Sequence, residues 1–294
     1  MFENIKNGWA IASQTRKAIF KDKELFVYPI LSAIVAIIEA IVIFAGLFIT
    51  VGAGNPIIWL VGLFLLYLVS AFTSTYFLMA LMIAFRSFQN GKKLGLGEAM
   101  GQVSSYTGLI LQWAIFTAVV LMILRIIESR LQGIGRILVS AIGGAAISVA
   151  TLFAVPIILD ERTGPIKTIE VSVAFFTKNF GSTFGGILCS DLYGLLFVLL
   201  GIVVVISGIL AGLYAVNSSG SVPFVGGVIT AIAIVAVGFA FILFGAILSA
   251  LISNIFKLVL YDFQKTGTLP DGFDKELMQK AIKQQKKSVF MGAL

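Results

Sequence analysis

The sequence predicts an all-α, polytopic membrane protein with six transmembrane helices and short interfacial helices on the cytoplasmic side. Two features of composition lead to this prediction. The 294 residues are 59% hydrophobic and 12% charged, whereas soluble domains carry about 25% charged residues. The mean hydropathy is +1.04. Six stretches with few or no charges are each long enough to cross the hydrocarbon, which takes about 20 helical residues.

Residues 1–24 precede the first of these stretches. Apolar side chains recur at helical spacing over residues 2–22, with Lys and Arg elsewhere on the wheel. This pattern predicts an amphipathic helix in the headgroup plane, with Trp9 as its interfacial anchor; a plain solvated helix is the alternative. The segment lacks the apolar core and cleavage site of a signal peptide, so we expect the first span to stay in the mature protein.

The first predicted hairpin joins two long apolar spans. Residues 25–50 form span 1, in which Glu39 is the one charged side chain. Residues 52–56 contain the Gly, Asn and Pro typical of a turn. Residues 57–85 form span 2, which is longer than a crossing needs and is expected to tilt or to project past the bilayer.

The second predicted hairpin follows a polar segment at residues 86–105. Residues 106–127 form span 3, and residues 137–159 form span 4. Pro156 lies near the end of span 4, where its missing N–H is expected to kink the helix.

The third predicted hairpin follows the longest polar break between spans, residues 160–183. Pro165 suits the first position of a helix, and the apolar spacing after it predicts a second helix lying on the membrane surface. Span 5 covers residues 187–214. Span 6 begins near Phe224 and stays uncharged until Lys257.

The chain therefore divides into an interfacial helix (residues 1–24), a transmembrane domain (25–261) and a basic cytoplasmic tail (262–294). Each Lys near an anionic lipid surface contributes about 1 kcal/mol to binding, so a tail helix that contacts such lipids is one reading. A frayed tail is the other.

The distribution of basic residues predicts the orientation. Six spans place both termini on one side, and 18 of the 21 Lys and Arg lie on that side. Only Arg125, Arg130 and Arg136 lie on the other. Because cytoplasmic loops collect Lys and Arg, we expect a multi-pass protein of the cell membrane with both termini in the cytoplasm.

The even-numbered spans end alike, which suggests three hairpins of related design. Each ends in a short polar run closed by a glycine. The glycine suits a left-handed position after a helix end. Many transporters also contain internal repeats, so this repetition does not separate a scaffold from a transporter. The runs begin at Arg86, Asp160 and Asp262 and close at Gly91, Gly164 and Gly267.

Two acidic residues are candidates for an intramembrane polar site. A carboxylate such as Glu39 in mid-membrane is costly and usually faces the bundle interior or water. It either couples protons or cations or makes one polar contact between helices, to a hydroxyl of span 2. Asp191 lies one turn into span 5, where the helix dipole favours an acid, and is treated as mostly structural. The candidate hydroxyls are those of Ser70, Thr73 and Thr75.

Small residues recur at spacings of four and seven on the last three spans, and such faces let membrane helices approach closely. We predict that spans 4, 5 and 6 pack tightly; the same faces could instead join copies in a homo-oligomer. The residues are Ser140, Gly144 and Ser148 on span 4, Gly194, Gly201, Gly208 and Gly212 on span 5, and Gly245 and Ser249 on span 6.

The sequence carries no recognisable catalytic apparatus. Histidine is absent, which removes the commonest metal ligand and the usual general base near neutral pH. Cys189 is the only cysteine and is expected to be a buried thiol. Walker, HExxH and GxSxG motifs are also absent. We therefore predict no enzyme activity, no catalytic residue, no metal and no cofactor.

Two stretches stand out, Trp9 followed by residues 20–32 (FKDKELFVYPILS), and residues 155–161 (VPIILDE) with Ser172. They resemble the start and the middle of a family of uncharacterised polytopic prokaryotic membrane proteins of unknown function. The resemblance covers spans 1 to 4. It implies the six-span architecture and brings no activity or catalytic residues.

The first functional hypothesis is a non-catalytic scaffold, accessory subunit or lipid-organising protein. Its expected partners are the bilayer, anionic lipids, and further copies of the chain or a larger membrane complex. No nucleic acid is expected among them. The alternative is a small-solute or ion transporter or channel that uses Glu39; a water-filled cavity reaching Glu39 would favour it, and dry packing the scaffold. A lipid-modifying enzyme is third and needs a cytoplasmic cleft around Asp160, Glu161 or Asp191.

Overall fold

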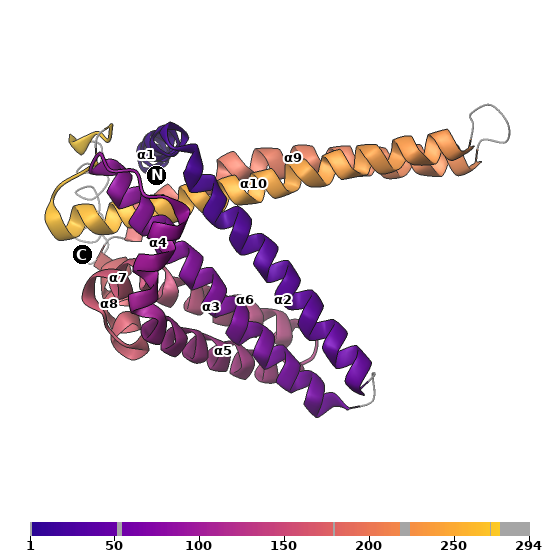
Figure 1. Ribbon diagram of the computed structural model, residues 1–294, viewed down its shortest axis with the longest axis horizontal. Helices are drawn as coiled ribbons and strands as arrows, with labels where there is room; N and C mark the ends of the chain where they lie inside the picture. The colour runs from indigo at the N-terminus through magenta and orange to yellow at the C-terminus, as the bar shows by residue number, and fades with distance from the viewer. Residues whose placement is uncertain (1, 52–54, 179, 218–223, 271, 277–294) are drawn as a thin grey trace.

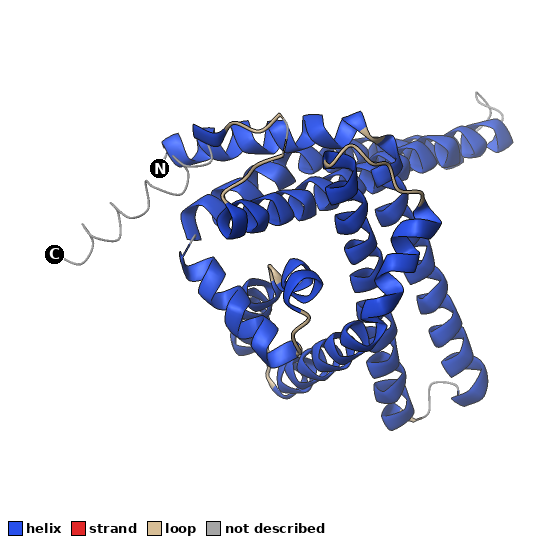
Figure 2. Cartoon of the chain, turned by 60° about the vertical axis from the view of Figure 1, so that its left-hand side comes forward, coloured by secondary structure: helices blue, strands red, loops and turns tan. Residues whose placement is uncertain are grey.

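The computed structural model describes residues 2–51, 55–178, 180–217, 224–270 and 272–276, and the regular elements in this part are all helices (Figures 1 and 2). The predicted all-α class is confirmed. The elements are α1 (Phe2–Lys21), η1 (Lys23–Phe26), α2 (Val27–Val51), α3 (Pro56–Gln89), α4 (Leu96–Val103), η2 (Ser104–Tyr106), α5 (Thr107–Arg130), α6 (Gly133–Thr151), α7 (Ala154–Glu161), α8 (Pro165–Lys178), α9 (Phe180–Asn217) and α10 (Phe224–Thr266).

Six helical stretches of the described chain are long and apolar enough to cross a membrane, so the predicted six spans and the multi-pass class are confirmed. They form three antiparallel hairpins, α2–α3, α5–α6 and α9–α10, which meet at one end and diverge toward their turns (Figure 1). The spans are Lys23–Ile49, Ile57–Gln89, Leu96–Arg130, Gly133–Glu161, Gly194–Asn217 and Val225–Thr266.

One order of elements occurs three times along the chain: a shorter helix followed by a long hairpin. The shorter helices are α1, α4 and α8. The first and third coincide with the two surface helices that amphipathic spacing predicts, and the second lies in the predicted polar segment 86–105. All three gather at the end where the hairpins meet (Figure 1).

Span 4 differs from the prediction, because it is broken rather than kinked. The helix stops at Thr151 and resumes at Ala154 as α7. Pro156 has no N–H to donate to the carbonyl of Leu152 four residues earlier, which explains a break at this place. The Phe153 N–H at the break donates instead to the buried Ser172 Oγ of α8 (3.2 Å).

The long helices run further than the apolar stretches alone indicate. Helices α3, α9 and α10 contain 34, 38 and 43 residues, or about 51, 57 and 65 Å at 1.5 Å per residue. The hydrocarbon is about 30 Å thick. Even when tilted, these helices therefore extend beyond it at one end.

The buried core lies at the shared end of the hairpins. It joins the last part of α3, the first six residues of α7 (Ala154 to Leu159) and the stretch of α10 from Leu248 to Phe263. Far from this end, large apolar side chains are exposed, such as Phe48 on α2 (68%) and Ile232 on α10 (63%). Such exposure over the outer hairpins is expected of helices whose solvent is lipid.

Candidate functional site

The three hairpins are joined by a cluster of charged side chains, which we call the charge cluster: Arg86, Asp160, Asp262 and Lys265. The Arg86 guanidinium donates through Nε and Nη2 to the two carboxylate oxygens of Asp262, with Nε–Oδ2 at 3.1 Å. Its Nη1 donates to Asp160 Oδ1. Lys265 Nζ donates to the other Asp160 oxygen at 3.1 Å. Two cations and two anions thus neutralise one another in a network with a two-point fork, the strongest arrangement of this kind.

Each hairpin contributes to the charge cluster at the end of its second span, which in the second hairpin is α7, the helix that follows α6. Arg86, Asp160 and Asp262 all lie within the last five residues of α3, α7 and α10. These are the positions at which the repeated endings of the even spans begin in the sequence. The repeated endings therefore identify these three positions as equivalent in the sequence. They do not reveal that Arg86 contacts both aspartates.

The turns after these helices follow the predicted pattern in two hairpins of three. Gly91 and Gly267 have the expected left-handed dihedrals, with φ of +76° and +72°. Gly164 does not; Arg162 holds the left-handed position instead, with φ of +50°. Its guanidinium lies 4.3 Å from the centre of the Tyr106 ring and donates to Ser105 Oγ at 3.4 Å. These contacts offset the strain of that backbone conformation.

The charge cluster is only partly exposed, which strengthens its interactions. The side chains of Arg86 and Asp262 are 28% and 25% exposed. Fully exposed ion pairs contribute about 0–1 kcal/mol, whereas breaking a buried pair costs about 3–5 kcal/mol. The energetic contribution of the charge cluster lies between these limits. Its structural role is to fix the relative position of three helix ends.

Two cavities flank Arg86, with volumes of about 670 and 460 Å³. Both are lined by Arg86, Asn90 and Asp160. Asp191 lines neither, and Glu161 accepts a hydrogen bond from the Tyr261 hydroxyl at 3.4 Å. Both oxygens of Asp160 accept hydrogen bonds from Arg86 and Lys265. Within the described ranges, no three His, Cys, Asp or Glu side chains are grouped so as to hold a metal ion.

Glu39 lies between the helices of the first hairpin. Thr73 Oγ1 donates a hydrogen bond to Glu39 Oε1, so Thr73 is the partner among the three hydroxyls considered. The second oxygen, Oε2, is buried and has no hydrogen-bond partner among the described residues. Glu39 lines neither cavity beside the charge cluster.

Asp191 has a different environment from the predicted one. Helix α9 begins at Phe180, so Asp191 lies about three turns inside the helix rather than one. The dipole effect fades beyond the first turn and does not explain this acid. Asp191 Oδ1 instead accepts a hydrogen bond from Ser249 Oγ of α10 at 2.8 Å, which links the two helices of the third hairpin.

The small residues of spans 5 and 6 lie at the contact between α9 and α10. A Cβ built on Gly201 would lie 2.6 Å from the Gly238 carbonyl oxygen, and one on Gly245 would lie 2.6 Å from the Gly194 oxygen. A Cβ on Gly208 would lie 2.9 Å from the Val235 nitrogen, and one on Gly212 would lie 3.2 Å from Ala231 Cβ. Gly238 belongs to the same contact and was not singled out by spacing.

The small residues of span 4 take no part in the contact between α9 and α10. This corrects the prediction of tight packing for spans 4, 5 and 6. Ser140 and Ser148 are exposed, and a Cβ built on Gly144 would meet no described atom within 4 Å outside its own helix turn. Helix α6 pairs with α5, and that hairpin diverges from α9–α10 (Figure 1). The close contact between α6 and α5 is at Gly143, which faces Leu124.

Three other predicted features are described in part or not at all. Trp9 is exposed on α1, which packs against α9 and α10. The side chain of Cys189 and the tail beyond residue 276 lie outside the part that the structure describes.

The profile of a family of unknown function (DUF6159) matches residues 57–271. This range contains the whole charge cluster and excludes Glu39. No curated protein and no solved structure matches the chain.

Proposed function

The chain belongs to DUF6159, a family of unknown function, and on this premise we propose that it is a non-catalytic membrane scaffold. In this role it acts as an accessory subunit of a larger assembly, organises lipid around itself, or does both. Its partners are the bilayer with its anionic lipids, and further copies of the chain or other membrane proteins. No nucleic acid and no cofactor takes part.

The observation that carries this proposal is the charge cluster. Arg86 holds the ends of α3, α7 and α10 together at one level, while the far ends of the hairpins diverge (Figure 1). Hairpin α9–α10 therefore presents apolar side chains on several sides, such as Val203 and Ile232. Hairpins that are joined at one end and apolar along their diverging parts suit the docking of other transmembrane helices or of lipid between them.

The proposal includes an orientation. The charge cluster and both termini lie on the cytoplasmic side of the cell membrane, and the hairpin turns lie on the other. The 18 Lys and Arg on the first side against three on the second support this orientation. A prokaryotic origin is part of the same proposal, and it rests on the resemblance of residues 20–32 and 155–161.

Gentle extraction followed by native mass spectrometry tests the scaffold role. We expect the wild-type chain to leave the membrane with a second copy or another membrane protein in fixed stoichiometry, and Arg86→Gln to lose that partner while remaining folded. Arg136→Gln changes an exposed arginine on α6 and serves as the control. A wild-type chain that is extracted with neither a partner protein nor bound lipid contradicts the proposal.

A transporter that uses Glu39 is the second candidate. The specific observation in its favour is the buried Glu39 Oε2, which has no partner among the described residues. A carboxylate oxygen in this state can accept a proton or a cation. Proteoliposomes loaded with a pH-sensitive dye test this candidate; flux that disappears in Glu39→Gln supports it, and no flux in the wild type removes it.

A further inference from the structure

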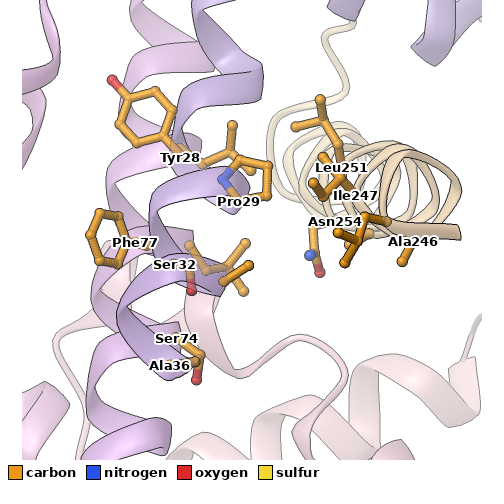
Figure 3. A pocket seen from close by; sticks show the side chains of 15 residues that line it. Tyr28, Pro29, Ser32, Ala36, Ser74, Phe77, Ala246, Ile247, Leu251 and Asn254 are labelled. Atoms are coloured by element: carbon orange, nitrogen blue, oxygen red, sulfur yellow. The ribbon is translucent and has the colours of Figure 1, made fainter. Parts of the chain in front are cut away.

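A lateral groove with a volume of about 370 Å³ lies between α2, α3 and α10, inside the membrane-spanning part (Figure 3). Its lining is apolar along most of its length, and it is contributed by small and branched side chains of all three helices. Leu243, at the end far from the charge cluster, is 55% exposed. The groove is therefore accessible from the surrounding lipid. Its lining includes Ser32, Ala36, Ser74, Ile247, Ala250 and Asn254.

A second cavity of about 250 Å³ adjoins this groove, and we call it the lysine cavity. It lies between α3, α6, α7 and α10 and is lined by Lys257, Ser148 and Thr151 among others. Leu78 and Asn254 line both spaces, so the two meet at these side chains. In Figure 3 the Asn254 amide projects from α10 into the space beside α2 and α3.

Within the described residues, the Lys257 amine has no neutralising contact. Its Nζ donates to Asn254 Oδ1 at 3.4 Å, and among the described residues no carboxylate lies within 4.0 Å of it. An ammonium has three N–H donors, so two remain for a ligand. Asp191 acts on Lys257 electrostatically from a greater distance, and its Oδ1 already accepts from Ser249. A positive charge inside a membrane-spanning helix is costly unless an anion or water neutralises it.

The two spaces follow one another in the order required by an amphiphile. Lys257 precedes Asp262 of the charge cluster by five residues, or about 7.5 Å along α10. From Asn254 the groove follows α10 away from the charge cluster to Leu243, a further distance of roughly 16 Å. The cationic, hydrogen-bonding end therefore lies near the membrane surface, and the apolar end extends into the hydrocarbon.

We propose that these two spaces form a binding site for one anionic phospholipid. The phosphate lies against the Lys257 ammonium in the lysine cavity, with the Asn254 amide and the Ser148 hydroxyl as further donors. An acyl chain occupies the lateral groove. A soluble phosphate would leave the apolar groove without a ligand, and a neutral lipid would leave Lys257 without an anion. This site does not depend on the scaffold role.

Native mass spectrometry of the full-length chain in mild detergent tests the proposal. The delipidated protein is titrated with phosphatidylglycerol, with phosphatidylcholine carrying the same acyl chains, or with inorganic phosphate. We expect one phosphatidylglycerol to bind at least about tenfold more tightly than phosphatidylcholine, because hydrogen bonds to charged groups are strong. Lys257→Met removes this difference. Lys17→Met, the same change at an exposed lysine of α1, retains it.

A second variant tests the groove. Ala250 is exposed on α10 and lines the groove, so Ala250→Phe fills it from the lipid side without disturbing the buried core. We expect this variant to bind both phospholipids at least about tenfold more weakly than the wild type, since it excludes the acyl chain that they share.

Photocrosslinking of the wild-type chain gives a test that needs no variant to fold. Phosphatidylglycerol with a diazirine on its acyl chain is expected to label the groove segments of α2 (residues 28–36) and α10 (residues 243–254). Equal affinity for the two phospholipids, undiminished phosphatidylglycerol binding by Lys257→Met, or labelling confined to other segments overturns the proposal. Displacement of the lipid by inorganic phosphate assigns the site to a soluble anion instead and likewise overturns it.

Discussion

Arg86 contacts the ends of both other hairpins, through Asp160 of α7 and Asp262 of α10. Its fork takes both oxygens of Asp262, and its remaining nitrogen donates to Asp160. A lysine could supply the charge but not the planar fork, so the two residues are not equivalent at this position. The geometry of the shared end therefore depends on an arginine.

Replacing Arg86 should destabilise the chain measurably. We expect Arg86→Met to lower the free energy of unfolding by about 1–3 kcal/mol, since it leaves two partly buried carboxylates with Lys265 alone. Thermal unfolding in detergent measures this change. Arg136→Met, on the exposed face of α6, is the control, and equal midpoints for the two variants would show that the charge cluster contributes no stability.

Gly267 and Gly164 form a matched pair at the residue scale. Gly267 has a φ of +72°, and an added Cβ meets open space; Gly164 is not left-handed, and its Cβ would lie at an ordinary 3.7 Å from Gln112 Oε1. We expect Gly267→Ala to cost about 1 kcal/mol, because L residues disfavour left-handed dihedrals. Gly164→Ala should be neutral. Chemical unfolding of both variants measures the two losses of stability. A larger loss for Gly164→Ala than for Gly267→Ala would contradict the prediction.

At the scale of elements, hairpin α9–α10 is held together by backbone approach. Gly194, Gly201 and Gly208 recur every seven residues, which keeps them on one face of α9. Small side chains matter here because lipid supplies no hydrophobic force between helices, so close van der Waals contact replaces it. The hydrogen bond from Ser249 to Asp191 adds a polar link toward the end at which the three hairpins meet.

Bulky residues at this contact should separate the two helices. We expect Gly201→Leu and Gly208→Leu each to lower stability in detergent by about 1–3 kcal/mol through overpacking. Gly144→Leu is the matched control, because a Cβ at Gly144 points into open space in the described chain. Thermal midpoints of all three, measured in one detergent, check the prediction. Identical midpoints would mean that the close approach is dispensable.

The elements also mark where sequence reasoning fails. Span 4 is uninterrupted in hydropathy, so a single helix is the natural prediction, yet α6 and α7 are separate. The break depends on Ser172 of another helix, which satisfies the Phe153 N–H. Likewise, the small residues of span 4 recur every four residues, as Gly245 and Ser249 of span 6 do. Only the divergence of the hairpins decides which of these helix faces meets a partner helix.

For the whole molecule, the hairpins repeat in order and converge at one end. A reporter fused after residue 294 tests the orientation that the basic residues predict. Since both termini should lie in the cytoplasm, an enzyme active only outside the cytoplasm is expected to stay silent there and to become active when inserted between Gln132 and Gly133, in the turn between α5 and α6. The opposite pattern would reverse the orientation and move the charge cluster to the outer surface.

The sequence by itself determined the helical class, the number of spans and the similar endings of the three hairpins. These properties are local, because solvation by lipid depends on the apolar length of each segment, and a helix satisfies its own backbone. Only the tertiary structure decided that Arg86, Asp160 and Asp262 meet, that Thr73 is the partner of Glu39, and that Lys257 lines a cavity with no acid of the described chain in contact with it. Contacts between segments distant in sequence depend on how the hairpins are placed relative to one another, and hydropathy carries no information about that placement.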